Sequence, residues 1–288
     1  WATIEVLGSF STTSGYSYRT FNFGPNGHIH LRPAVPTNYT IDVDAETWPR
    51  YASDGRVTVG EHATVHIIGS NYENMAVHFE VYGAIKMHRA AQVYGVTLHP
   101  GSFFYLAPTD SVGTHFTSNL FCRDGASIVA LPPPQADWPV PEMVLQSVFA
   151  NFEPECRLMG GMRLRMTGGD AVFSSQTHAV ENITMSGGVL AWTALADQGA
   201  LKTISMLGGR LHFYNTEEGP SVDTLDATGG HVHLHGPSEV VNATLRSRIT
   251  LYSTLHAKHT FDWLQGTLAS ATGRSGRLTV GQRLLLRG

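Results

Sequence analysis

The chain has little charge and no long apolar run. Only 15% of its 288 residues are charged, and 19 Lys and Arg nearly balance 23 Asp and Glu, so the formal net charge is −4. This balance gives no electrostatic basis for binding nucleic acid. No run of 18 apolar residues occurs, and we therefore expect no membrane insertion in this segment.

Signatures of common catalytic centres are also absent. The sequence contains no Gly-x-Ser-x-Gly elbow, no P-loop and no recognisable Cys–His nucleophile arrangement. It begins at Trp1 without a visible signal peptide, so we expect a processed chain or an excerpt of a longer one.

Glycine, in contrast, is abundant, and pairs of it recur at a fixed spacing. Gly187-Gly188, Gly208-Gly209 and Gly229-Gly230 lie 21 residues apart, each at the same point of the same pattern. An earlier copy covers Leu164–Phe173, and a copy without the glycines covers Ala243–Leu251. Repeats of about 20 residues predict stacked supersecondary units.

Each repeat is predicted to form two short strands joined by a tight corner. Apolar residues alternate with a period of two within a repeat, which is typical of strands with one buried face. The glycine pair between the strands permits a positive φ or a close backbone approach. The inward positions then align in four columns: Ile183, Ile204 and Leu225; Met185, Met206 and Ala227; Leu190, Leu211 and Val232; and Trp192, Phe213 and Leu234, which Leu251 extends.

Such a pattern is typical of a β-solenoid, in which like residues stack at the spacing of strands, about 4.8 Å. The chain resembles the right-handed parallel β-helix superfamily, the architecture shared by pectin lyases, phage tailspikes and many surface proteins. The resemblance is sharpest over about residues 160–270 and is specific for the fold rather than for one family. It implies an all-β chain with coils of about 20 residues. Leucine-rich repeats have a similar length, but their Leu-rich consensus with an Asn or Cys ladder is absent.

We expect one solenoid over residues 1–288. Irregular coils or a cap would occupy 1–55, less regular coils 56–159 and regular coils 160–288. The segment 131–141 interrupts the pattern, because its five prolines in eleven residues cannot pair as a central strand. It is predicted to form an excursion loop. There Trp138 would either contact a ligand or fold back as a cover on the solenoid.

Two features favour an extracellular or cell-surface location. Asn38, Asn182 and Asn242 each begin an Asn-X-Ser/Thr sequon, and the last two directly precede inward positions, so their side chains should point outward. Cys122 and Cys156, 34 residues apart, could lie on nearby coils and form a disulfide in an oxidising compartment. Two buried free thiols are the alternative.

Histidine offers a candidate metal site, besides Asp42, Asp44 and Glu46, whose spacing on one strand face could serve Ca²⁺. His231 and His233 point outward in the predicted strand, and the 21-residue register places His212 directly on His233. Neighbouring imidazoles at strand spacing could share Zn²⁺ or Cu²⁺. No Cys or acidic residue completes the ligand set, and a row of outward polar side chains needs no metal to form. We therefore expect no cofactor, and the metal site stays an alternative.

Carboxylates do not form a convincing catalytic pair, although β-helix enzymes usually act on acidic polysaccharides. Asp42, Asp44 and Glu46 would share one face of a strand, but no basic residue lies close in register. The outward row through Thr184 and Ser205 contains a single acid, Asp226. We assign no catalytic residue.

Three functions from different classes remain. We favour a non-enzymatic structural or adhesive segment of a larger extracellular protein. The alternatives are a carbohydrate-active enzyme, either a polysaccharide lyase or a glycoside hydrolase, and a glycan- or protein-binding module. Leu284, Leu285 and Leu286 form an apolar run where a solenoid needs a polar cap. We therefore expect another domain or chain to pack on the C-terminal coil.

Overall fold

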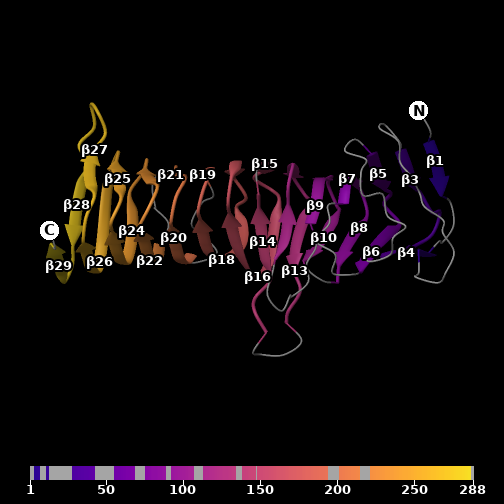
Figure 1. Ribbon diagram of the computed structural model, residues 1–288, viewed down its shortest axis with the longest axis horizontal. Coiled ribbons are helices and arrows are strands. Elements are labelled where there is room, and N and C mark those ends of the chain that lie inside the picture. The colour runs from indigo at the N-terminus through magenta and orange to yellow at the C-terminus, as the bar shows by residue number, and fades with distance from the viewer. Residues whose placement is uncertain are drawn as a thin grey trace. The chain divides into compact units, whose positions relative to one another are not determined.

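A computed structural model describes the fold over residues 3–6, 11–12, 28–42, 55–68, 75–88, 92–106, 113–133, 138–146, 148–193, 201–214 and 221–286. These ranges contain strands and turns but no helix. The strands stack in parallel, and the chain is an all-β parallel β-solenoid with coils of about 21 residues (Figure 1). The predicted fold class is therefore confirmed. The chain divides into two compact units, and whether they form one solenoid domain stays a prediction.

The first unit comprises Trp1–Val144 and Glu155–Gly161. Up to Leu106 its strands pair in two parallel stacks, because alternate strands along the chain lie on neighbouring coils. The next coil contributes three strands, two of which pair with the strand Gln92–Leu98. The strands that lie wholly within it are β1 Thr3–Val6, β2 Ser11–Thr12, β3 His28–Leu31, β4 Thr37–Asp42, β5 Gly55–Val59, β6 Ala63–Ile68, β7 Met75–Val81, β8 Ala84–Met87, β9 Gln92–Leu98, β10 Phe103–Leu106, β11 Thr114–Phe116, β12 Asn119–Cys122 and β13 Ser127–Ala130.

The core of the first unit consists of columns of apolar side chains. Each column runs along one stack and takes one residue from each strand. One of these columns has six members, each with between 0% and 1% of its surface exposed. Strand pairing sets these residues in register, one from each of β4, β6, β8, β10, β13 and β16 (Arg157–Met166): Tyr39, Val65, Ile85, Phe104, Ile128 and Leu158.

The second unit comprises Leu145–Pro154 and Met162–Gly288. It repeats the two-stack arrangement with a more regular coil length. Its strands are β15 Val148–Phe152, β17 Gly169–Phe173, β18 Thr177–Met185, β19 Val189–Trp192, β20 Leu201–Met206, β21 Arg210–Phe213, β22 Ser221–Ala227, β23 His231–Leu234, β24 Ser238–Leu245, β25 Arg248–Leu251, β26 Thr254–Trp263, β27 Thr267–Ser270, β28 Arg277–Val280 and β29 Arg283–Leu286. Two strands, β14 (Glu142–Leu145) and β16, contain residues of both units.

All four predicted inward columns of the second unit are confirmed by the strand register. Ile204 pairs with Ile183 on one side and with Leu225 on the other, which is the 21-residue spacing of the glycine pairs. The corner works as expected: Gly209 has a φ of +79°, and a Cβ there would lie 2.7 Å from the carbonyl oxygen of Gly188. Glycine is therefore needed at this corner for both its conformation and its size.

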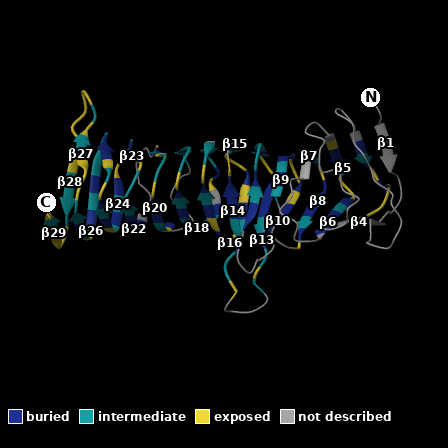
Figure 2. Cartoon of the chain, in the orientation of Figure 1, coloured by how far each residue is buried: buried dark blue, intermediate teal, exposed yellow. Residues whose placement is uncertain are grey.

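The aromatic column is longer than predicted. Trp192 lies between Phe173 and Phe213 in register, with the Trp192 ring stacked on the Phe173 ring at 4.1 Å between centroids. The column is buried throughout, and Figure 2 shows buried segments along the coils of both units. Its members are Phe152, Phe173, Trp192, Phe213, Leu234 and Leu251.

The proline-rich segment leaves the coil as predicted. Strand β13 ends at Ala130 and β14 begins at Glu142, and the described residues between them form no strand (Figure 1). Trp138 is 36% exposed, so its side chain is not sealed against the coils.

Candidate functional site

Histidine and tyrosine side chains gather on the outer surface of β21, β23 and β25. In β23, His231 and His233 face outward because Val232 and Leu234 fill the core, and His235 follows directly after the strand. Arg210 pairs with His231 and His212 with His233, as the 21-residue register predicts. We call this surface the histidine face and define it by His212, Tyr214, His231, His233, His235 and Tyr252.

The rings of the histidine face stack from coil to coil. The His212 and His233 rings lie 4.2 Å apart between centroids at an angle of 3°. The His235 ring lies between two tyrosine rings, with centroids 4.1 Å from Tyr214 and 4.2 Å from Tyr252. The flat surfaces of these rings cover one another, so the ring edges, where the imidazole nitrogens lie, remain free to make polar contacts.

Three of these imidazoles converge. Ring nitrogens of His212, His233 and His235 all lie within 4.8 Å of one another, and His212 Nδ1 is 3.1 Å from His235 Nε2. The sequence predicted His231 as the third member. In the structure His231 Nε2 instead lies 2.9 Å from the hydroxyl oxygen of Thr250, and His235 takes its place in the convergent group.

Burial and neighbouring positive charge keep these imidazoles neutral. The pKa of His233 falls from 6.5 to about 4, chiefly because burial disfavours the charged ring, with smaller contributions from His231, His212, His235 and Arg210. Burial also lowers the pKa of His212, and Arg210 adds to it. At pH 7 their ring nitrogens therefore carry free lone pairs or neutral N–H groups.

A second polar cluster, in the first unit, escaped the sequence analysis. The Glu80 carboxylate lies 2.8 Å from His99 Nε2 and 3.3 Å from His78 Nε2, and the Tyr82 ring stacks on that of His99 at 4.1 Å. Burial raises the pKa of Glu80, but hydrogen bonds and charge from the two histidines outweigh it and lower the pKa from 4.5 to about 2. Gly95 leaves room for this arrangement, since a Cβ there would lie 2.4 Å from His78 Nδ1.

The signal for this cluster was present in the alternation of β7. His78 and Glu80 occupy the outward positions between Val77, Phe79 and Val81, all of which are buried. Glu80 pairs with Thr97, however, and His99 lies two residues beyond it, so the coil spacing alone does not place His99 beside Glu80.

The sequon asparagines point away from the core, as expected. Asn38 and Asn242 are exposed and Asn182 is partly exposed. The side-chain oxygen of Asn38 lies 3.3 Å from His66 Nε2, and His66 Nδ1 lies 2.9 Å from His88 Nε2.

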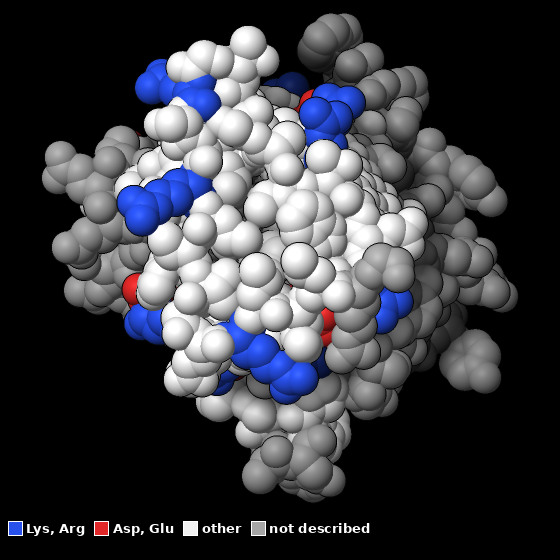
Figure 3. Space-filling model, turned by 90° about the vertical axis from the view of Figure 1, so that its left-hand side faces the viewer, with Lys and Arg blue, Asp and Glu red and all other residues white. Residues whose placement is uncertain are grey.

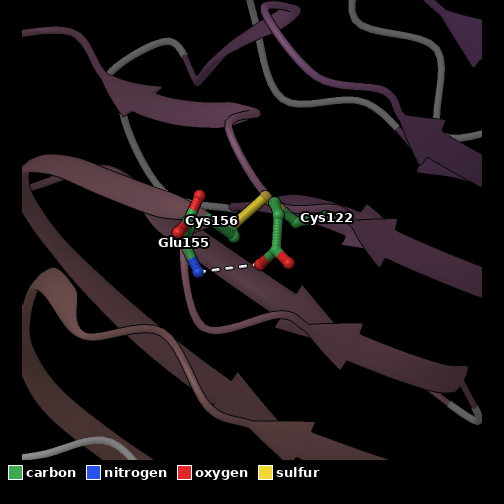
Figure 4. The surroundings of a disulfide bond; sticks show 4 residues. Cys122, Glu155 and Cys156 are labelled. Carbon is green, nitrogen blue, oxygen red and sulfur yellow. Dashed lines mark hydrogen bonds between the residues drawn. A yellow bond between two sulfur atoms is a disulfide. The ribbon is translucent and has the colours of Figure 1, made fainter.

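The two cysteines are brought together in the first unit. Cys122 and Cys156 form a disulfide with a Cα–Cα distance of 5.7 Å (Figure 4). Beside it, the backbone N–H of Glu155 donates a hydrogen bond of 2.9 Å to Asp124 Oδ1. Of the two thiol states left open by the sequence, the structure has the disulfide.

The two acids of the outward row in the second unit stay apart. The outward row through Thr184, Ser205 and Asp226 is in register as predicted, and it continues through Thr244 to Asp262. Its two acids lie two coils apart, or about 9.6 Å at the usual strand spacing. Asp44 and Glu46 lie outside the described residues, as does the side chain of Asp42.

The last coil of the second unit exposes apolar side chains. Leu284 pairs with the buried Phe261 and so occupies an inward position, yet it is 49% exposed, and Leu286 is 68% exposed. Figure 3 views this end: its centre is largely free of charged side chains, and basic ones stand around its border. Arg274, Arg277 and Arg283 are exposed residues of this coil.

Comparisons of the chain with protein-family models, with curated proteins and with solved structures find no match. In the part of the chain that the structure describes, no helix is long and apolar enough to cross a membrane.

Proposed function

We propose that this chain is a non-enzymatic structural or adhesive segment of a larger extracellular or cell-surface protein, and a member of the right-handed parallel β-helix (pectin-lyase-like) superfamily. The observation that carries the proposal is the continuous column from Phe152 to Leu251, which fills the core of six successive coils. Such a ladder gives each coil the same contacts with its neighbours, which suits a stiff scaffold.

A cavity inside the second unit is too small to hold a ligand. A cavity of about 10 Å³ lies between Phe213 and Leu234, and the other residues that line it are Ile204, Val222, Leu225, Ser238 and Val240. This is roughly the volume needed for a single water, and far less than the few hundred Å³ of typical small-molecule sites.

The compartment is inferred from the disulfide and the sequons. Disulfides such as Cys122–Cys156 persist in oxidising environments and are rare in the cytosol of most organisms. The exposure of Asn38 and Asn242 is compatible with glycosylation of the folded chain. Both observations support a secreted glycoprotein.

The apolar end of the second unit supports a role in a larger assembly. Leu284 and Leu286 stand at or beside inward positions of the coil, where a further coil, another domain or a partner chain would bury them. Burying a leucine side chain contributes about 1.5–3 kcal/mol, so covering both gives a substantial driving force. Adhesion or scaffolding through this end is the form of partnership we propose.

Cross-linking mass spectrometry on the native assembly tests the proposal. Lys258 belongs to β26, which pairs with β28 and β29 of the last coil. Its amine forms an ion pair with Glu239, and its side chain is 45% exposed, so a cross-linking reagent can reach it. We expect cross-links from Lys258 to another domain or chain, and no turnover of acidic polysaccharides by the purified protein. Polysaccharide cleavage that disappears in Asp226→Asn or Asp262→Asn would establish the enzyme alternative instead.

A recognition module is the second candidate, because Trp138 is exposed on the proline-rich excursion. Exposed tryptophan is a frequent anchor in protein and glycan binding. Binding to a glycan array or to matrix proteins that Trp138→Ala abolishes, but that Leu207→Ala preserves, would favour this function. Leu207 is a matched control because it is exposed as well, at 60%.

A further inference from the structure

We propose that His212, His233 and His235 form a binding site for a divalent transition-metal cation, Zn²⁺ being the physiological choice. The site lies on the outer surface of the second unit and is independent of the structural role proposed above. Three imidazoles with one open position form a ligand set that proteins use for Zn²⁺.

The positions of the ring nitrogens support this assignment. Zn²⁺ binds histidine nitrogen at about 2.0–2.1 Å, so two nitrogens of a tetrahedral site lie about 3.3 Å apart. His212 Nδ1 and His235 Nε2 are already 3.1 Å apart, and the nitrogens of the whole group lie within 4.8 Å. Because the His212 and His233 rings stack at 3° and a ring nitrogen binds a metal in the plane of its ring, the His233 ring has to turn out of this stack before all three nitrogens reach one ion.

The site also contains a polar atom without a partner. His233 Nδ1 is buried and has no hydrogen-bond partner, although buried ring nitrogens are normally satisfied. A metal ion that takes this lone pair satisfies it. The contact between His212 and His235 places two nitrogens edge to edge, and a shared cation replaces the single proton between them.

The surroundings determine which cations fit. The convergent group contains imidazoles alone, which suit Zn²⁺, Cu²⁺ or Ni²⁺ and not the oxygen-seeking Ca²⁺ or Mg²⁺. The tyrosine rings on both sides of His235 hold it in place. The positive charge of Arg210 acts on His212 and His233 and repels a bound cation, so it lowers the affinity of the site for Zn²⁺.

Isothermal titration of the untagged full chain with ZnCl₂ tests the site. We expect one Zn²⁺ per chain in the parent. The affinity for Zn²⁺ should fall by at least roughly 10–100-fold in His233→Ala and in His235→Gln. That loss is typical when a residue that only supports a metal ligand is removed, and these two residues are proposed as ligands themselves. His256→Gln is the matched control, because it removes a partly exposed histidine of the second unit that lies outside the convergent group and contacts Thr279 instead, and it should keep parental affinity.

Arg210→Gln provides a test in the opposite direction, since removing the nearby positive charge should tighten Zn²⁺ binding several-fold. Circular dichroism melting of every variant checks the fold, and His235→Gln alters only a partly exposed side chain beyond the end of β23. A parent chain that binds no Zn²⁺, or a His235→Gln variant that binds as the parent does, overturns the proposal. So does a loss of affinity in His256→Gln that equals the loss in His233→Ala.

Discussion

Truncating Phe213 to alanine should strongly destabilise the second unit. Phe213 is 2% exposed and lies in register between Trp192 and Leu234, so its ring contacts the coils on both sides. Loss of the ring removes about 1.5–3 kcal/mol of transfer free energy. A residual void of roughly 100 Å³ at about 24 cal/mol per Å³ adds about 2.4 kcal/mol. The expected loss in the free energy of unfolding is therefore about 4–5 kcal/mol.

Collapse around the truncated side chain is restricted. Trp192 and Leu234 each belong to the same column and are held by their own coils, and a cavity of about 10 Å³ already adjoins Phe213. The new void would join this cavity rather than close. For this reason the loss should fall in the upper part of the range for Phe→Ala substitutions, about 3–5 kcal/mol.

Urea unfolding followed by tryptophan fluorescence measures this effect. Trp192 reports from beside the mutated position, with its ring centroid 6.3 Å from that of Phe213. At a slope of about 2–3 kcal/mol per molar urea, the midpoint should fall by about 1.5–2.5 M. Leu207→Ala, at a 60% exposed position of the same repeat, should change stability by less than about 0.5 kcal/mol. If Phe213→Ala and Leu207→Ala unfold at the same urea midpoint, the predicted register of the coils is refuted.

Three further predictions concern other parts of the fold. Replacing Cys122 and Cys156 with alanine opens a 34-residue loop and should destabilise the first unit by about 4 kcal/mol, measured by chemical unfolding; equal stability of the parent with and without reductant would contradict this. The pKa of Glu80 is lowered to about 2, so its contribution of about 2–3 kcal/mol is complete above pH 4.5 and is lost as the pH falls towards 2. Glu80→Gln should flatten this acid limb of a stability profile, and an unchanged profile would show that the histidine contacts add nothing. Left-handed backbone strain costs about 1–2 kcal/mol for a residue with a Cβ. In thermal melts Gly273→Ala should show this cost alone, because Gly273 has a positive φ and open space around it. Gly209→Ala should lose more stability, because its Cβ would also collide with the neighbouring backbone.

The regular coils could be predicted from sequence because their length is constant. The 21-residue spacing of the glycine pairs identifies the neighbours of Ile204 and Phe213 without other information. Where the coil length varies, the same reasoning fails. Glu80 pairs with Thr97, 17 residues on rather than 21, and its contact with His99, two residues further, could be found only from the structure.

The histidine face shows a second limit of the sequence. Register places His212, His231 and His233 on one surface, but convergence of their nitrogens depends on side-chain rotation. His231 turns to Thr250, and His235, just beyond the end of β23, turns towards His212. Strand periodicity determines which side of the sheet a residue occupies and does not determine its hydrogen-bond partner.

Distances between spin labels on one outward column test the stacking of the second unit most directly. Strand pairing sets Asn182, Thr203, Thr224, Asn242, Thr260 and Arg283 in successive register steps. Labels at Asn182→Cys and Arg283→Cys should lie five strand spacings apart, about 24 Å between Cα atoms, and labels at Asn182→Cys and Thr224→Cys about 10 Å apart. Electron paramagnetic resonance should find narrow distributions that scale with the number of coils. Distances that do not increase in these steps, or a broad distribution for either pair, would contradict the parallel β-solenoid.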